Sequence, residues 1–342
     1  MRGQNILTAR CGWARFAAAV ALAALLAACG PLRENIAPTA PAMSGQWASL
    51  LDEIRRFERG IGFDATGNFA DVANDLSAFP FCGHAPALVL PWSYEDPAIR
   101  WSNAESAEDC RARAPNDDIY FRKLEAQGES STPVTGAMLA GKLDRFVYLV
   151  LHEDCHDQFE LPYGVEESLC DFVTHQAMSA FAEQNYSPLS RERRSIRRYA
   201  ETQAELAQAT VEWYAQVEAL YARHGRGEIT ADALLIERTV LFSAAEQPLG
   251  FARGELNNVS LATNMTYSRY YTQIGAAFEA NGRDLARSVT FFKMIDAGRR
   301  NGGAAQQQRR IGEARSAGFL REQEGAIINA IGSAARGAGN PR

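Results

Sequence analysis

Hydrophobic side chains recur at helical spacing from residue 44 onwards. In residues 44–60 they stand three and four positions apart, at Trp47, Leu50, Leu51, Ile54 and Phe57. A helix with this spacing turns one apolar face towards a core, and Ser44 can cap its first turn. We therefore expect an amphipathic helix over residues 44–60.

Residues 78–134 follow another pattern, because prolines interrupt their short apolar runs. Examples of these runs are ALVL at 87–90 and IYF at 119–121. Short apolar runs bounded by proline and other turn residues are typical of strands. We expect a few short strands here.

Helical periodicity resumes at about residue 135 and continues to about 159. The sequence LPYG at 161–164 interrupts it, and it restarts through residue 182. A long amphipathic helix is expected over about 188–224, and two or three more over 231–298. The predicted fold class is mainly α (α+β), with a small sheet on the N-terminal side and long helices.

The last segment, 298–342, differs in composition from the rest of the chain. It holds eight arginines against three glutamates and is rich in glycine, alanine and glutamine. We expect a low-complexity basic tail that is disordered or forms one loose helix near 319–335. A basic contact with anionic lipid or another partner is the alternative.

The overall composition indicates a globular protein. The chain has 342 residues, of which 46% are hydrophobic and 22% charged, which excludes a wholly disordered, collagen-like or multi-spanning membrane chain. Its 41 acidic and 35 basic side chains give a net charge of −6. An acidic protein is a poor candidate for binding nucleic acid.

The first 28 residues have the pattern of an export signal. Three arginines without an acid precede an apolar run at 16–28, which is too short to span a bilayer comfortably. The sequence LAAC at 26–29 resembles the lipobox of bacterial lipoproteins. This resemblance implies that Cys29 becomes a lipid-carrying N-terminus, and Gly30 after it favours the outer membrane, facing the periplasm. An ordinary secretory signal is the alternative, and residues 29–43 are expected to form a tether.

Export to an oxidising compartment changes how the remaining cysteines are interpreted. Four lie in the mature domain, at Cys82, Cys110, Cys155 and Cys170. Three pairings into two disulfides are possible. We favour Cys82 with Cys110 and Cys155 with Cys170, and buried free thiols are the alternative.

The strongest chemical signal is HEDCH at 152–156, which matches H-E-x-x-H after the apolar run FVYLVL. Four residues advance a helix by slightly more than one turn, so His152 and His156 can meet one metal ion. Glu153 lies beside them, where its carboxylate can act as a general base towards water without being a ligand.

A second helix can supply the remaining groups of such a site. The sequence VEESLCDF at 165–172 follows the LPYG turn, and a catalytic zinc needs three protein ligands. Either Glu166 or Glu167 could be the third. Asp171 stands four residues after Glu167, so it can accept a hydrogen bond from a ligand imidazole and orient it.

H-E-x-x-H followed by E-x-x-x-D on the next helix resembles the gluzincin metallopeptidases. The ten residues between His156 and Glu167 resemble most a family of bacterial lipoproteins described as aminopeptidases. That family typically has H-E-L-A-H, N-E-S-F-A and L-N-N-A, against HEDCH at 152–156, EESLC at 166–170 and LNNV at 256–259 here. The resemblance covers roughly residues 140–295.

The resemblance implies a zincin-like domain with one Zn²⁺ per chain, held by His152, His156 and Glu167, that hydrolyses peptides. It also implies that Tyr267 helps to stabilise the oxyanion; a packed aromatic is the alternative. Alanines of both family motifs are replaced by Cys155 and Cys170, which suggests a disulfide between the two metal-binding helices.

The family's asparagine is replaced by Glu166, which is a possible contact for a substrate amine. His175, four residues after Asp171, fits either the surroundings of the site or the surface. We find no convincing G-x-S-x-G, Walker or Rossmann glycine motif, so serine hydrolases and nucleotide enzymes are disfavoured.

The expected organisation is therefore a signal peptide at 1–28, a tether at 29–43, a metallopeptidase domain at 44–297 and a basic tail at 298–342. The expected function is zinc-dependent peptide hydrolysis by a lipoprotein of the bacterial envelope. Two alternatives are an inactive metal-binding scaffold protein and a metal hydrolase that acts on a non-peptide amide.

Overall fold

The computed structural model describes residues 43, 45–73, 79–126, 131–307 and 316–338, and in 301–307 the backbone alone. The expected signal peptide, Cys29 and nearly all of the tether lie outside these residues. None of the described helices is both long enough and apolar enough to cross a membrane.

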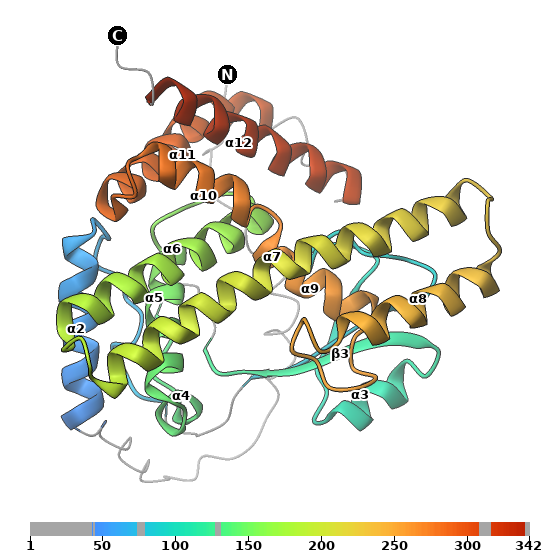
Figure 1. Cartoon of the computed structure of the whole chain (residues 1–342), viewed down its shortest axis with the longest axis horizontal. Coiled ribbons are helices and arrows are strands. Elements are labelled where there is room, and N and C mark those ends of the chain that lie inside the picture. Colours follow the sequence, from blue (N-terminus) through green and yellow to red (C-terminus); the bar gives the residue numbers. More distant parts are fainter. Residues whose placement is uncertain (1–42, 44, 74–78, 127–130, 308–315, 339–342) are drawn as a thin grey trace, which may run out of the picture. The chain divides into compact units, whose positions relative to one another are not determined.

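The described chain is mainly helical with one small sheet, which confirms the predicted fold class (Figure 1). The helices are α2 (Gly45–Gly60), α3 (Ala107–Arg113), α4 (Gly136–Ala140), α5 (Leu143–His156), α6 (Tyr163–Asn185), α7 (Arg191–Gly225), α8 (Ala231–Ala245), α9 (Asn258–Ser268), α10 (Tyr271–Ala280), α11 (Leu285–Gln307) and α12 (Ala317–Ala338). The strands are β1 (Phe79–Pro86), β2 (Arg100–Ser102) and β3 (Asp117–Leu124).

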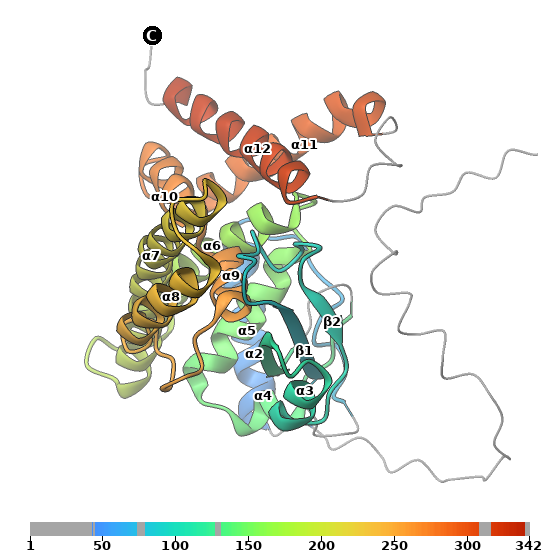
Figure 2. The same cartoon turned by 90° about the vertical axis from the view of Figure 1, so that its right-hand side faces the viewer.

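The three strands form an antiparallel sheet in the order β2-β1-β3. Ala85 and Ile99 on one face pack against Val259 and Ala262 of α9. The opposite face packs against α3 around the Cys82–Cys110 disulfide. Figure 2 shows the sheet with α3 on one side and α9 and α5 on the other. The sheet thus lies beside α9, which carries Tyr267.

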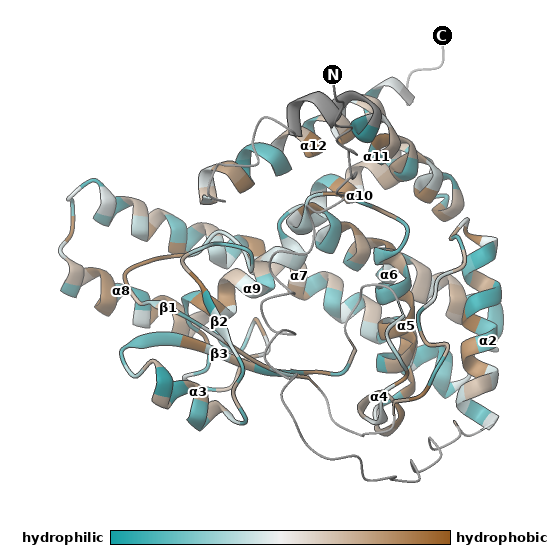
Figure 3. Ribbon diagram, turned by 180° about the vertical axis from the view of Figure 1, so that it is seen from behind, coloured by the Kyte–Doolittle hydropathy of each residue, from teal (hydrophilic) through white to brown (hydrophobic). Residues whose placement is uncertain are grey.

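Helices α5 and α6 lie at the centre of the main core. The apolar run predicted to precede the histidines is buried in α5 and is brown in Figure 3. The two helices are separated by residues 157–162, so the break expected at 161–164 comes two residues earlier at its end: Pro162 caps α6, and Tyr163 and Gly164 begin it. The second favoured disulfide joins them: Cys155 and Cys170 are bonded, with Cα atoms 5.6 Å apart.

Asn68 holds the end of α5 to the loop that follows α2. Its side chain is fully buried and donates to the Glu153 carbonyl at 3.2 Å and to the Asp154 carboxylate at 3.1 Å. Its amide oxygen accepts hydrogen bonds from the backbone N–H groups of Ser131 and Thr132. This one side chain therefore connects three segments behind the histidine motif.

Two expectations about the C-terminal half need correction. Four helices, α8 to α11, begin in residues 231–298, because three breaks, at 246–257, 269–270 and 281–284, divide the apolar pattern more finely than its period shows. The expected loose helix near 319–335 is α12, and it is not loose. Its Ile327 and Ile331 belong to the main core, because they form an apolar stripe that α10 and α6 cover.

Candidate metal site

His152, His156 and Glu167 come together as one group. The Nε2 atoms of the two histidines are 3.2 Å apart, and Glu167 Oε2 lies 3.3 Å and 3.4 Å from them. Consecutive turns of α5 supply the histidines, and the second turn of α6 supplies the glutamate. Within the described chain, this is the group of histidine, cysteine and acidic side chains close enough to hold a metal ion.

The donor atoms fit a zinc ion in number, type and separation. Ligand atoms about 2.0–2.1 Å from a tetrahedral zinc stand about 3.3 Å apart, which matches the observed spacings. Glu167 Oε2 is buried and has no well-aligned hydrogen-bond partner among the described residues. A buried carboxylate oxygen without a donor is costly, so the group is suited to a cation.

A carboxylate orients each histidine from behind. Asp171 Oδ1 lies 3.2 Å from His152 Nδ1, and Glu166 Oε1 lies 3.2 Å from His156 Nδ1. Such partners fix the tautomer, because the Nδ1–H donates to them and leaves Nε2 free to bind a metal.

Glu166 therefore has two partners inside the protein. Its second oxygen accepts the backbone N–H of Leu161 at 2.8 Å. These contacts place Glu166 with His156 and not in the group of possible metal donors, which contains Glu167. Its expected contact with a substrate amine stays a prediction.

The charges of the site favour a cation at its centre. Burial lowers the pKa of His152, but its close contacts with the Asp171 and Glu167 carboxylates raise it to about 9. Burial raises the pKa of Glu167, but the charge of His156 and the closeness of both imidazoles lower it well below its ordinary value. The acids thus attract positive charge to the position that the three donors surround.

Glu153 is buried and next to this group without being part of it. Burial raises the pKa of its carboxyl group, and the nearby charges of His152 and His156 lower it. No hydrogen-bond partner from the described residues engages this carboxylate, so it is available to a water molecule or a substrate. That is the requirement for a general base.

Tyr267 lies beside His152, with ring centroids 6.1 Å apart. Burial and the charge of Glu167 raise its pKa well above the ordinary value, so the phenol keeps its proton. A protonated phenol can donate a hydrogen bond to an oxyanion. The structure brings Tyr267 to the group, and its catalytic role stays a prediction.

Several neighbouring tyrosines were not predicted from the sequence. Tyr148 donates to Asp171 at 2.6 Å and so holds the carboxylate that orients His152. Burial and the charge of Glu167 raise the pKa of Tyr163 and of Tyr94. Tyr148 and Tyr163 stand four residues before His152 and Glu167, so helical spacing could have identified them. Tyr94 comes from a distant loop and has no such signal.

His175 is buried, which corrects the surface alternative. Its Nδ1 lies 2.9 Å from the Tyr271 hydroxyl, and its Nε2 has no partner among the described residues. Burial lowers its pKa, which favours the neutral imidazole.

The two asparagines of the motif LNNV form hydrogen bonds that hold the surrounding backbone in place. Asn257 caps α9 in a capping box with Ser260. The amide of Asn258 donates to the carbonyls of Ala87 and Val89 at 3.0 and 2.7 Å. These bonds hold the loop that leads to Tyr94.

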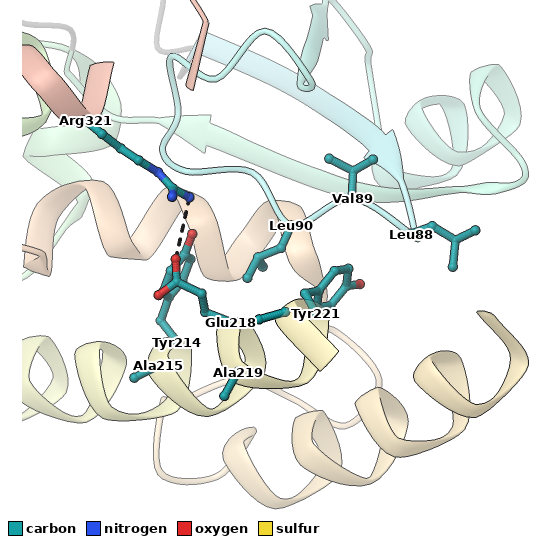
Figure 4. Close-up of a pocket in the computed structure, with 10 residues that line it drawn as sticks. Leu88, Val89, Leu90, Tyr214, Ala215, Glu218, Ala219, Tyr221 and Arg321 are labelled. Atoms are coloured by element: carbon teal, nitrogen blue, oxygen red, sulfur yellow. Dashed lines mark ion pairs between the residues drawn. The ribbon is translucent and has the colours of Figure 1, made fainter. Parts of the chain in front are cut away.

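The same loop forms one wall of a groove of about 690 Å³, opposite α7 (Figure 4). Its lining is mainly apolar, and the ion pair between Arg321 and Glu218 crosses it at 3.5 Å. It contains none of the histidines or acids described above.

Residues 103–306 match the protein family described as "Putative aminopeptidase". No curated protein and no solved structure matches the chain. The matched segment contains α5, α6 and α9, and hence the histidines, Glu167 and Tyr267. Because it covers more than half of the chain, the protein belongs to this putative aminopeptidase family.

Proposed function

We propose that this protein is a zinc-dependent peptidase of the gluzincin type. The observation that carries the proposal is the buried group of His152, His156 and Glu167, whose three donor atoms lie 3.2–3.4 Å apart. Two nitrogens and one carboxylate oxygen are a usual ligand set for catalytic zinc. When bound, zinc would act as a Lewis acid that polarises the scissile carbonyl.

The chain's own residues then move the protons and stabilise charge. The Glu153 carboxylate takes a proton from the attacking water and returns it to the leaving amine. The Tyr267 phenol donates a hydrogen bond to the carbonyl oxygen as negative charge develops on it. Asp171 and Glu166 keep the imidazoles in the required tautomer.

The test separates metal binding from catalysis. Glu153→Gln should keep zinc and lose about 10²–10⁴-fold in peptide cleavage, since the amide cannot accept the proton. Glu167→Gln should lose zinc and activity together, because a neutral amide is a poorer ligand than a carboxylate. Glu205→Gln, an exposed change on α7, is the control. Metal analysis and a peptide-library assay supply the two readouts.

Two results would reject the proposal. One is wild-type cleavage by Glu153→Gln, and the other is full zinc content after His152→Ala and His156→Ala together. Comparing peptides with free and acetylated amino termini would separate an aminopeptidase from an endopeptidase.

We also propose that the protein is exported and anchored by lipid at Cys29 to the periplasmic side of the outer membrane. Support comes from the sequence: the apolar run at 16–28, LAAC at 26–29 and Gly30. Two disulfides in the described domain agree with an oxidising compartment.

A further inference from the structure

Arg122 is an exposed cation on β3, on the sheet face that α9 covers. Tyr120, two residues earlier, contacts the cluster formed by the sheet and α9, and alternate residues of a strand share a face. The Arg122 guanidinium carbon lies 5.5 Å from the centroid of the Tyr120 ring. Arg122 therefore lies on the face of the sheet that packs against α9, the helix that carries Tyr267.

A chain of aromatic contacts connects this position to Glu167. Arg122 stands directly opposite Phe81 in the β1–β3 register, and opposite residues in antiparallel strands lie on one face. Phe81 stacks on Tyr94 with centroids 5.3 Å apart, and Tyr94 lies 5.6 Å from Tyr163.

The last ring of this chain is next to a possible metal donor, because Tyr163 stands one helical turn before Glu167 on α6. Arg122 thus stands opposite the first ring of a row formed by Phe81, Tyr94 and Tyr163, and Glu167 follows the last ring.

The described acids near Arg122 along the strand bond other cations. The three acids on and next to β3 have other partners: Asp117 bonds Arg100 at 3.0 Å, Asp118 bonds Arg238 at 2.6 Å and Glu125 bonds Arg145 at 2.6 Å. Within the described residues, no acidic side chain forms an ion pair with Arg122. Arg122 is an exposed residue, so an anion from solution can approach its side chain.

The position of β3 suits recognition of an extended peptide. β3 is an edge strand, with β1 as its neighbour on one side. Edge strands can bind extended peptides through backbone hydrogen bonds, while side chains beside them select the residues.

We propose that Arg122 determines specificity by binding a carboxylate of the peptide substrate, an inference that rests on the proposed peptidase function. A guanidinium presents paired N–H donors that match the two oxygens of a carboxylate. The carboxylate can be an acidic side chain or the C-terminus of a short peptide, and the chemistry of recognition is the same.

Three peptides of one alanine-based sequence distinguish these sources. One carries glutamate and an amidated C-terminus, one glutamine and a free C-terminus, and one glutamine and an amidated C-terminus. Arg122→Ala should lower kcat/KM about 10–100-fold for whichever carboxylate is bound, as expected for a hydrogen bond to a charged group. The fully neutral peptide should be unaffected, and Arg122→Lys should restore part of the loss.

Lys123→Ala is the matched control, because this exposed cation is the next residue of β3 and faces the opposite way. It should change none of the three rates. Equal effects of Arg122→Ala on all three peptides, or no effect on any, would overturn the inference.

A binding measurement keeps this inference separate from the proposed function. The same peptides are titrated calorimetrically into the Glu153→Gln protein, with and without Arg122→Ala, so no turnover is needed. If the peptides with a carboxylate bind more tightly and this advantage is lost in the Arg122→Ala variant, the inference is supported even if the wild-type protein cleaves no peptide. Cleavage without any carboxylate dependence would leave the peptidase function standing and reject the role of Arg122.

Discussion

At the scale of single residues, the candidate metal site depends on the partners of each histidine. Each histidine has a carboxylate beside its Nδ1 atom. Asp171 is the partner of His152 and Glu166 is the partner of His156, and both acids belong to α6. Tyr148 in turn bonds Asp171. The proposed ligands are therefore held in place by the protein itself.

We predict that the two orienting carboxylates contribute to metal affinity. Asp171→Asn and Glu166→Gln should each weaken zinc binding about 10–100-fold, because an amide orients the imidazole less firmly than a carboxylate does. Competition with a chromogenic chelator measures the affinity. Glu183→Gln, an exposed change on the same helix, is the control, and unchanged affinity in both variants would contradict the prediction.

Behind the motif, Glu58 of α2 is a buried acid beside Asp154. Burial, followed by the charge of Asp154, raises the pKa of Glu58 from 4.5 to about 9. A carboxyl group with a raised pKa stabilises the fold below its unfolded pKa, and this contribution is lost as the pH rises towards the folded pKa.

The stability of the metal-free wild-type protein, relative to Glu58→Gln, should therefore fall between pH 4.5 and about 9. Urea unfolding of both proteins at several pH values measures the difference, and a difference that does not change with pH would refute it.

At the scale of elements, the disulfide Cys155–Cys170 joins the two helices that carry the proposed metal donors. Replacing both cysteines by alanine should lower the free energy of unfolding by about 2–4 kcal/mol. It should also weaken zinc binding, because α5 and α6 lose their covalent link.

The second disulfide provides the comparison. Removing Cys82–Cys110, which lies between the sheet and α3, should destabilise the protein without changing zinc affinity. Equal zinc affinities in the wild type and both variants would show that the α5–α6 link does not position the donors.

Helix α12 reaches the start of α6 through Glu324. This carboxylate accepts hydrogen bonds from Trp92 and Tyr270 at 2.9 and 2.7 Å. Its other oxygen occupies the space beside Gly164, where an added Cβ would lie 2.4 Å away.

We predict that Gly164→Ala destabilises the protein by about 1–3 kcal/mol through this clash. In a Glu324→Ala background the same change should be neutral or stabilising, because alanine favours a helix. Thermal unfolding of the four proteins completes a double-mutant cycle, and an equal cost in both backgrounds would contradict the contact.

At the scale of the whole molecule, the described residues belong to one compact unit. Its helices include none able to cross a membrane. The membrane attachment proposed above is at Cys29, outside the described residues.

The Cys29→Ser variant should move from the membrane fraction to the soluble fraction of cells, because each buried CH₂ of a lipid chain contributes about 0.8 kcal/mol to membrane binding. Fractionation followed by immunodetection measures this change. A variant that stays entirely in the membrane fraction would argue against the lipid anchor.

Local patterns were enough to predict much of this protein. The helices at 44–60 and 188–224 follow from apolar spacing, because a helix repeats every 3.6 residues whatever surrounds it. The pairing of His152 with His156 follows from the same geometry. The two disulfides also agree with the favoured pairing.

Other features depend on contacts between distant segments. Glu166 and Glu167 are adjacent in the sequence, and their separate roles arise from how α6 packs against α5. The apolar stripe of α12 is short and lies in a basic, glycine-rich segment, so its burial follows from the surfaces that α10 and α6 present. The row of rings formed by Phe81, Tyr94 and Tyr163 joins a strand, a loop and a helix. Periodicity reports which face of an element is apolar, and only the tertiary packing decides which side chains meet across it.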